Sequence, residues 1–346
     1  MANTQAHVSC TALWLCLGLM GAPLAWAQAA YRTTSVAPSV YRQVFSPSQA
    51  RWGGDNPLKQ GTRLNPEDRL ISRGSGMATI LCDSGSFLFK KRNYTQVSSF
   101  CQAQRAAPIQ ALPGIQDPAT PYLLEPRATL VRGPEVLVRW NPVAGAHHYQ
   151  VWLLRQRDRR LLWGTQVSGV SHTVLPRAVG LVSGETYRLV IEADTGSSSQ
   201  LEASSASLGF GILSPTEAVR LTADLQDIHS LDSEQAPAQA RALLEAGALE
   251  QHALIAEAMT VLTKQEDQAE SLEGQLQLGR LSSLQGLNRR AIHHFQRAIA
   301  LANVNADQEA KGLANAAIIL SERLAACAAS QPQTGPASSC HLSSPP

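Results

Sequence analysis

The chain has 346 residues, of which 44% are hydrophobic and 16% charged, and its formal net charge is +2. No aromatic stripe accompanies the basic residues, so the composition does not indicate nucleic-acid binding. The charge changes along the chain: residues 30–116 hold 11 basic and 4 acidic residues, residues 117–215 hold 9 and 8, and residues 216–346 hold 9 and 15. This gradient predicts that the basic head and the acidic tail attract each other, or that the head faces an anionic polymer. A third interpretation is that basic runs such as residues 90–92 only form a solvated hairpin end.

The first 29 residues have the features of an export signal. Residues 1–29 contain no Lys, Arg, Asp or Glu, and the apolar run over residues 11–25 is followed by small residues at Ala27 and Ala29. We therefore predict a signal cleaved after one of these two alanines, and a periplasmic or extracellular protein. The alternative is an uncleaved anchor, although the run is shorter than the ~20 residues of a membrane span. No later run is long enough to cross a bilayer, so no membrane span is expected after cleavage.

Four cysteines remain after the predicted signal, namely Cys82, Cys101, Cys327 and Cys340. An even number of cysteines in an exported chain favours disulfides. Cys82 and Cys101 lie in one compact β-rich segment, so we predict that they pair. Cys327 and Cys340 could close a loop after the last helix, and the sequence leaves this second bridge open.

The first folded unit is expected over residues 51–113, after a Ser/Pro/Gln-rich linker over residues 30–50. Its short apolar runs alternate between Gly, Asn-Pro and Asp-Ser-Gly turns, which is typical of a small antiparallel β unit. A motif runs through Gly61, Leu64, Pro66, Asp68 and Leu70 and then Asp83, Gly85 and Ser86. With this motif the unit resembles the periplasmic domain of FecR-type proteins. The resemblance implies a β fold. It does not imply signal relay across a membrane, because an export signal stands where those regulators carry a cytoplasmic segment and a membrane span.

A Pro-rich linker over residues 113–121 leads to a second β unit over residues 121–215. Apolar residues alternate at Val136, Val138 and Trp140, at Tyr149, Val151 and Leu153, and at Leu189, Ile191 and Ala193. The spacing of Leu181, Gly184 and Tyr187 is that of a tyrosine corner, in which the phenol returns to the upstream backbone. These residues resemble a fibronectin type III domain. The resemblance implies an immunoglobulin-like β-sandwich with Trp140, Tyr149 and Tyr187 in its core.

Four arginines crowd one strand connection of this sandwich, at Arg155, Arg157, Arg159 and Arg160. The ordinary interpretation of such a cluster is a solvated turn. Contact with an anion is the alternative.

The acidic third of the chain contains a repeat with a spacing of 33 residues: residues 286–295 are similar in sequence to residues 253–262. This period is typical of stacked helical hairpins. Residues 272–305 resemble a tetratricopeptide repeat at Leu278, Gly279, Gly286, Ala291, Phe295 and Ala298. The resemblance implies that the glycines allow close approach and turning, that the alanines are small at the helix crossing, and that the phenylalanine fills the space between hairpins. We predict a helical array over residues 216–328, in which residues 307–326 form a last apolar helix that could cap the stack, and a disordered tail over residues 329–346.

A stack of helical hairpins leaves a concave surface that can hold another polypeptide. The first helix of each hairpin lines this surface, which predicts where a partner would bind. The predicted partner-binding groove consists of Glu250, Gln275, Gln277, Ser282 and Ser283.

The sequence lacks the motifs of the common catalytic and cofactor sites: no Gly-x-Ser-x-Gly, His-Glu-x-x-His or phosphate-binding loop is present. His and Cys residues do not occur at metal-ligand spacing, so no metal or cofactor is expected. We therefore predict a multidomain, non-catalytic adaptor of the cell envelope that binds a protein or peptide through the groove. Two alternatives are a protein that binds an anionic envelope polymer through its basic N-terminal half, and a hydrolase with a cleft that only the fold would reveal.

Overall fold

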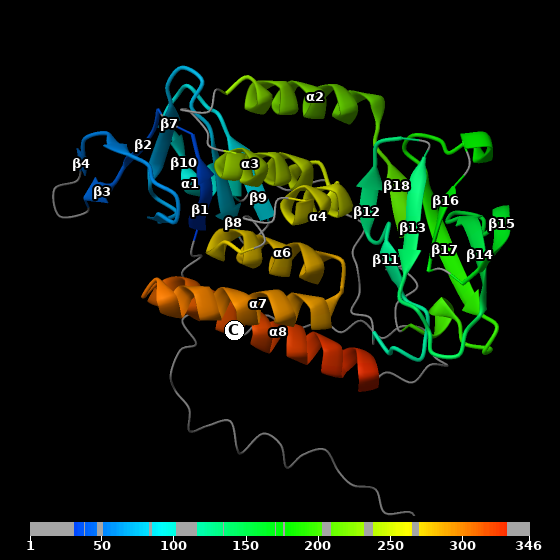
Figure 1. The fold of residues 1–346 in the computed structure, drawn as a ribbon. Coiled ribbons are helices and arrows are strands. Elements are labelled where there is room, and N and C mark those ends of the chain that lie inside the picture. The colour runs from blue at the N-terminus through cyan, green and yellow to red at the C-terminus, as the bar shows by residue number, and fades with distance from the viewer. Residues whose placement is uncertain are drawn as a thin grey trace, which may run out of the picture.

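Two β units flank a stack of helices (Figure 1). This fold comes from a computed structural model. The structure describes residues 31–330, apart from positions 38, 47–50, 83–84, 102–115, 134, 170, 176, 203–208, 232–237 and 265–269. The predicted export signal, residues 113–115 of the second linker, and the tail from residue 331 onward lie outside the described residues. The expected class, two β units followed by a helical array, is confirmed.

The N-terminal β unit consists of short strands in two four-stranded sheets, ordered β6-β1-β8-β9 and β10-β7-β2-β5, with a separate β3-β4 pair. The strands are β1 (Tyr31–Val36), β2 (Val40–Gln43), β3 (Phe45–Ser46), β4 (Arg51–Trp52), β5 (Asn56–Pro57), β6 (Arg63–Leu64), β7 (Arg69–Ser72), β8 (Ala78–Cys82), β9 (Gly85–Phe89) and β10 (Thr95–Gln96). The short helix α1 (Val97–Cys101) follows β10.

The predicted linker over residues 30–50 is wrong, because β1 and β2 are inner strands of the two sheets. β1 pairs with both β6 and β8, and Thr33 lies opposite Ile80. The side chains of Thr33 and Thr34 are polar but buried. Their hydroxyls donate hydrogen bonds to the carbonyls of Lys59, at 2.7 Å, and Thr79, at 3.4 Å. Polar side chains that are buried through hydrogen bonds give no alternating apolar pattern in the sequence. The polar composition of residues 30–50 therefore indicated a linker.

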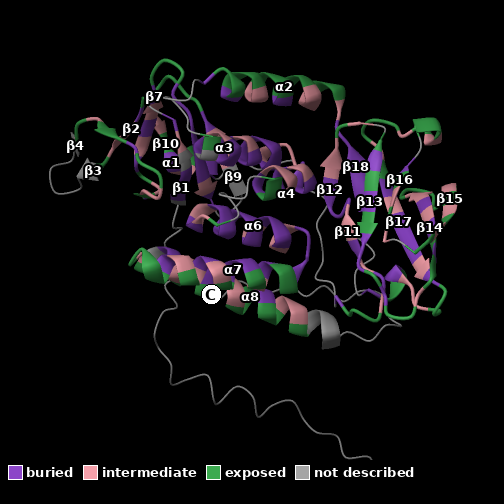
Figure 2. Cartoon of the chain, in the orientation of Figure 1, coloured by how far each residue is buried: buried purple, intermediate pink, exposed green. Residues whose placement is uncertain are grey.

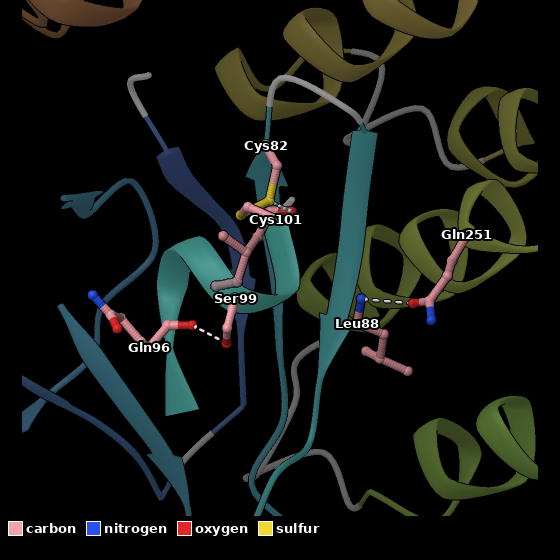
Figure 3. Close-up of a disulfide and its surroundings, with 7 residues drawn as sticks. Cys82, Leu88, Gln96, Ser99, Cys101 and Gln251 are labelled. Atoms are coloured by element: carbon pink, nitrogen blue, oxygen red, sulfur yellow. Dashed lines mark hydrogen bonds between the residues drawn. A yellow bond between two sulfur atoms is a disulfide. The ribbon is translucent and has the colours of Figure 1, made fainter. Parts of the chain in front are cut away.

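The predicted disulfide between Cys82 and Cys101 is confirmed (Figure 3). The two Cα atoms lie 5.4 Å apart and the residues are separated by 19 positions. The bridge ties the end of β8 to the end of α1, beside a buried apolar cluster that includes Leu70, Ile80 and Phe89. The second possible bridge is not tested, because Cys340 lies outside the described residues.

The second β unit is a sandwich of a three-stranded sheet, β11-β13-β16, and a five-stranded sheet, β12-β18-β17-β14-β15. Its strands are β11 (Leu123–Glu125), β12 (Thr129–Val131), β13 (Val136–Trp140), β14 (His148–Arg155), β15 (Leu161–Ser168), β16 (His172–Leu175), β17 (Thr186–Ala193) and β18 (Gly209–Ile212). Neighbouring strands are antiparallel except β12 and β18, which pair in parallel.

The core residues predicted for the sandwich are confirmed. Trp140 is 1% exposed, and its ring lies edge-on to Tyr149 at a centroid distance of 5.3 Å. The hydroxyl of Tyr149 accepts a hydrogen bond from the backbone amide of Val143 at 2.8 Å. The phenol of Tyr187 returns to the upstream backbone, where it accepts from the amide of Val182 at 2.6 Å. This contact fixes the crossing between the two sheets.

In the part of the chain that the structure describes, six helices follow: α2 (Pro215–His229), α3 (Ala238–Gln251), α4 (Ile255–Lys264), α6 (Leu272–Leu284), α7 (Asn288–Val304) and α8 (Gln308–Ser330). α2 begins with a capping box in which the side chains of Ser214 and Glu217 each bond the backbone amide of the other. Within the part of the chain that the structure describes, none of these helices is long and apolar enough to cross a membrane.

The small residues of the predicted repeat lie where two helices touch. A Cβ atom on Gly279 would lie only 2.6 Å from the ring of Phe295, so α6 and α7 approach closely at this glycine. Gly286 has a φ of 69° in the turn between these helices, a conformation that favours glycine. Ala291, Phe295 and Ala298 are buried and belong to one apolar cluster between α6, α7 and α8. The expected structural positions of these five residues are therefore observed.

Candidate functional site

The predicted partner-binding groove is not open. Glu250, Gln275, Gln277 and Ser282 are each at most 1% exposed, and Ser283 is half-buried. Figure 2 shows α6, which carries four of these five residues, as an almost entirely buried helix. A partner cannot reach these side chains in this structure. The prediction that they line an accessible groove is therefore wrong.

Two of these polar side chains, those of Gln275 and Glu250, connect helices of the stack. The amide oxygen of Gln275 lies 2.9 Å from Nδ1 of His294 on α7. Glu250 on α3 forms an ion pair with Arg280 on α6. The hydroxyl of Ser283 donates to the carbonyl of Gly279, one turn earlier in α6, at 3.1 Å. The polar character of Glu250, Gln275 and Ser283 reflects contacts inside the protein, which a single sequence cannot distinguish from a polar binding surface. The side-chain amide of Gln277 and the hydroxyl of Ser282 are buried without a hydrogen-bond partner in the structure.

The N-terminal β unit covers one face of α3. α3 packs on strands β1, β8 and β9. A Cβ atom on Gly247 would lie 2.5 Å from the side chain of Thr79, so this glycine allows α3 to lie directly on β8. The backbone amide of Leu88 on β9 donates to the side chain of Gln251 at 3.0 Å (Figure 3). The face that would begin a concave groove is thus occupied by the chain itself.

Among the described residues, ion pairs join the basic head of the chain to its acidic tail at two places. At the first, the buried guanidinium of Arg32 on β1 lies 2.7 Å from Asp307 and 3.4 Å from Glu273. At the second, Lys90 lies 2.7 Å from Asp224 and 2.6 Å from Asp227, both on α2. The first of the two expectations from the charge gradient, attraction between head and tail, is confirmed.

At the second place, beside Lys90, the pKa of the Asp224 carboxyl group is shifted. Burial alone would raise the pKa of Asp224, but hydrogen bonds from His252 and Lys90 hold it below its usual value. The same two aspartates, Asp224 and Asp227, raise the pKa of Lys90 against the effect of its burial. Lys90 and Asp224 are therefore both charged at neutral pH and hold the segment that follows β9 on α2.

The sandwich binds the opposite ends of the helices. The fully buried guanidinium of Arg127 donates to Glu202 at 2.8 Å and to the backbone carbonyl of Gln285, between α6 and α7, at 2.5 Å. The amide of Leu130 donates to the carbonyl of Ala253, between α3 and α4, at 2.9 Å. The helical stack is therefore held from both sides, by one β unit on α2 and α3 and by the other on the interhelical turns.

His294 is a buried histidine of the stack with a strongly perturbed pKa. Burial is the main cause, and the neighbouring charges of Arg290, His293 and Arg297 add to it, so the pKa falls to about 4. The ring is neutral at neutral pH and bonds Gln275. This histidine serves the packing of α7 on α6, and its environment does not suit a proton-transfer role near neutral pH.

The last helix, α8, lies at the edge of the array and packs on α7 and α6 (Figure 1). One stripe on its outer side consists of Gly312, Ala316, Ile319, Leu320 and Arg323, which we call the α8 face. Ile319 is 46% exposed and Leu320 is 39% exposed. Figure 2 shows α8 along the edge of the molecule, with exposed and half-buried residues facing outward. The sequence predicted an apolar helix that could cap the stack. It did not reveal that α8 is apolar on two sides, of which only one packs on α7.

The described residues contain no group of three or more His, Cys, Asp or Glu side chains placed to hold a metal ion. Comparison of the chain with protein-family models and with curated proteins finds no match in either. The candidate site is therefore defined by geometry alone: a helical stack fixed between two β units, with an exposed apolar stripe at its open end.

Proposed function

We propose that the protein is an exported, non-catalytic adaptor of the cell envelope that binds another polypeptide through the α8 face. The observation that carries this proposal is the exposure of Ile319 and Leu320 on the terminal helix of a helical stack. Terminal units of such stacks usually present a polar outer surface, because an apolar one invites a further helix to pack on it.

The chemistry of the α8 face suits one kind of partner segment. Its residues recur at intervals of three and four positions, so they form a single ridge along the helix. Gly312 and Ala316 are small and allow a second helix to approach closely, while Ile319 and Leu320 supply apolar contact area. Arg323 ends the stripe and is exposed. The matching partner is an amphipathic helix with an acidic residue near one end, which would extend the stack by one helix.

The exported location and the three family resemblances belong to this proposal. The disulfide is consistent with an oxidising compartment, and the first 29 residues have the features of an export signal. The FecR-like and fibronectin-like units act in this account as supports that fix the tetratricopeptide-like stack. Binding of an anionic polymer by the N-terminal half is less well supported, because Arg32 and Lys90 are already neutralised by carboxylates of the same chain.

Site-specific photo-crosslinking in cells that naturally produce the chain tests the proposal. A photoreactive phenylalanine derivative replaces Ile319 in one variant. In the control variant it replaces Val219, which is 70% exposed on α2 at the other end of the stack. We expect a discrete adduct with another envelope protein from position 319 and none from position 219.

Mass spectrometry of the adduct decides between the outcomes. An adduct with a different protein, linked through a helical segment, supports the adaptor function. Adducts from position 219 alone, adducts with a second copy of this chain alone, or no adduct from either position would contradict it. Fractionation of the same cells checks export, since the adaptor must be found outside the cytoplasm and without residues 1–27 or 1–29.

A further inference from the structure

A concavity of about 560 Å³ lies on the outer face of the five-stranded sheet, away from the helical stack. Its floor comes from β14, β15 and β17, and one wall is the connection between β14 and β15. The volume is in the range of small-molecule sites. The pocket lining includes four arginines, Arg155, Arg157, Arg159 and Arg188, of which the last comes from β17 and belongs to a distant part of the sequence.

Two of the four arginines have carboxylate partners. Nη1 of Arg157 lies 2.9 Å from Glu185, and Nε of Arg155 lies 3.5 Å from Asp158. Arg157 is largely exposed and its ion pair is at the surface, so water screens it. These contacts neutralise part of the positive charge at the rim of the pocket.

The other two arginines are not neutralised. Among the residues that the structure describes, neither Arg159 nor Arg188 forms an ion pair. Arg188 is half-buried, and its Nε atom is buried without a hydrogen-bond partner. Burial, and then the nearby charge of Arg159, lower the pKa of Arg188, which nevertheless stays protonated. A half-buried guanidinium beside a second cation lacks the anion that usually accompanies it.

Apolar side chains form the floor between these arginines. Trp152 lies opposite both Gly164 and Val190 in the sheet. A Cβ atom on Gly164 would lie 2.7 Å from Cδ1 of the indole, so the ring rests directly on the glycine. Leu161, at the beginning of β15, is 57% exposed at the pocket. The pocket thus combines an aromatic and aliphatic surface with two free guanidinium groups.

We infer that this pocket binds a small organic anion, a carboxylate or phosphate joined to an apolar ring or chain. Guanidinium groups pair with planar carboxylate and with phosphate oxygens through charge-assisted hydrogen bonds. The indole of Trp152 and the side chain of Leu161 cover the apolar part of the ligand. Such a ligand restores the missing partner of Arg188 and neutralises Arg159. The inference is independent of the adaptor function, because the pocket lies on another unit and on another surface.

Isothermal titration calorimetry of the full exported chain tests this inference. The probes are phenyl phosphate, phenylacetate and, as the uncharged control, phenol. We expect both anions to bind, with an affinity that falls as salt is added, and phenol to bind far more weakly. Arg188→Gln and Arg159→Gln each remove one charge and should weaken binding of both anions about 10-fold or more. The matched control is Arg220→Gln, because Arg220 is exposed on α2 and does not line the pocket.

Arg159→Gln provides the test if Arg188→Gln fails to fold, since Arg159 is exposed in the connection between β14 and β15. In a second experiment, polygalacturonate competes with phenylacetate for the pocket. If it displaces phenylacetate, the pocket takes a carboxylate carried by a polymer. If it does not, the pocket takes a free small anion. The inference is overturned if neither anion binds at millimolar concentration, if phenol binds as well as the anions, or if Arg159→Gln binds them like the unchanged chain.

Discussion

Replacing Arg127 by Ala should destabilise the whole protein, because this arginine holds the sandwich on the helical stack. Its side chain is 0% exposed, and that of its partner Glu202 is 1% exposed. The guanidinium also donates to the carbonyl of Gln285, in the turn between α6 and α7. Arg127→Ala leaves a buried carboxylate and a buried carbonyl without this donor. Removing one partner of a buried ion pair costs about 3–5 kcal/mol of unfolding free energy.

The assay is guanidinium denaturation of a chain carrying Trp52→Phe, followed by far-ultraviolet circular dichroism for the helices and by fluorescence of Trp140, Trp152 and Trp163 for the sandwich. The double variant Arg127→Met with Glu202→Leu is the control, since it removes both charges and should cost much less than Arg127→Ala. We also expect the helical and tryptophan signals of Arg127→Ala to separate into two transitions. A loss below about 1 kcal/mol in Arg127→Ala, or a double variant as unstable as the single one, would show that the buried ion pair does not hold the sandwich on the helices.

Four further predictions concern packing, the disulfide and pH. Cys82→Ser removes the disulfide and should lower the unfolding free energy by about 2–4 kcal/mol; equal denaturation midpoints with and without reductant would count against this. Trp140→Ala opens a cavity in the sandwich core and should cost about 3–5 kcal/mol, whereas Tyr187→Phe loses one hydrogen bond and should cost about 1 kcal/mol; the reverse order in a denaturation series would refute the assigned contacts. Ser282→Arg places a charge in a fully buried position and should lower the melting temperature sharply. An unchanged melting temperature would indicate that Ser282 lies on an open surface. The pKa of His294 falls from 6.5 to about 4 on folding, so the unfolded chain binds more protons and stability should be lost as the pH falls from 6.5 to 4; His294→Gln should flatten melting temperature against pH over this window, and an unchanged slope would contradict the assignment.

The strands and helices with regular apolar spacing could be predicted from the sequence. Alternation placed Trp140 and Tyr149 in the sandwich core, and the 33-residue period located the hairpin of α6 and α7. Glycine positions were informative where a side chain would collide, as at Gly279 against Phe295. In these elements the local pattern and the tertiary packing favour the same structure.

The first strands and the candidate site could not be predicted, because both depend on contacts between distant segments. β1 is polar at Thr33 and Thr34, and its burial only follows from its pairing with β8. Gln277 and Ser282 occur on the helix where a groove was expected, yet both are buried. The same limit applies to Arg188, which joins the arginines of the β14–β15 connection only through strand pairing.

In the proposed adaptor, a partner binds the α8 face and not the buried polar side chains of α6. The most direct measurement is the affinity of the purified chain for the protein cross-linked at position 319, compared between two variants of equal melting temperature. Ile319→Asp combined with Leu320→Asp should raise the dissociation constant about 100-fold, because two apolar contacts of roughly 1.5 kcal/mol each are lost. Gln277→Ala should leave the dissociation constant unchanged. Normal binding by the α8 double variant, together with loss of binding in Gln277→Ala, would contradict the account.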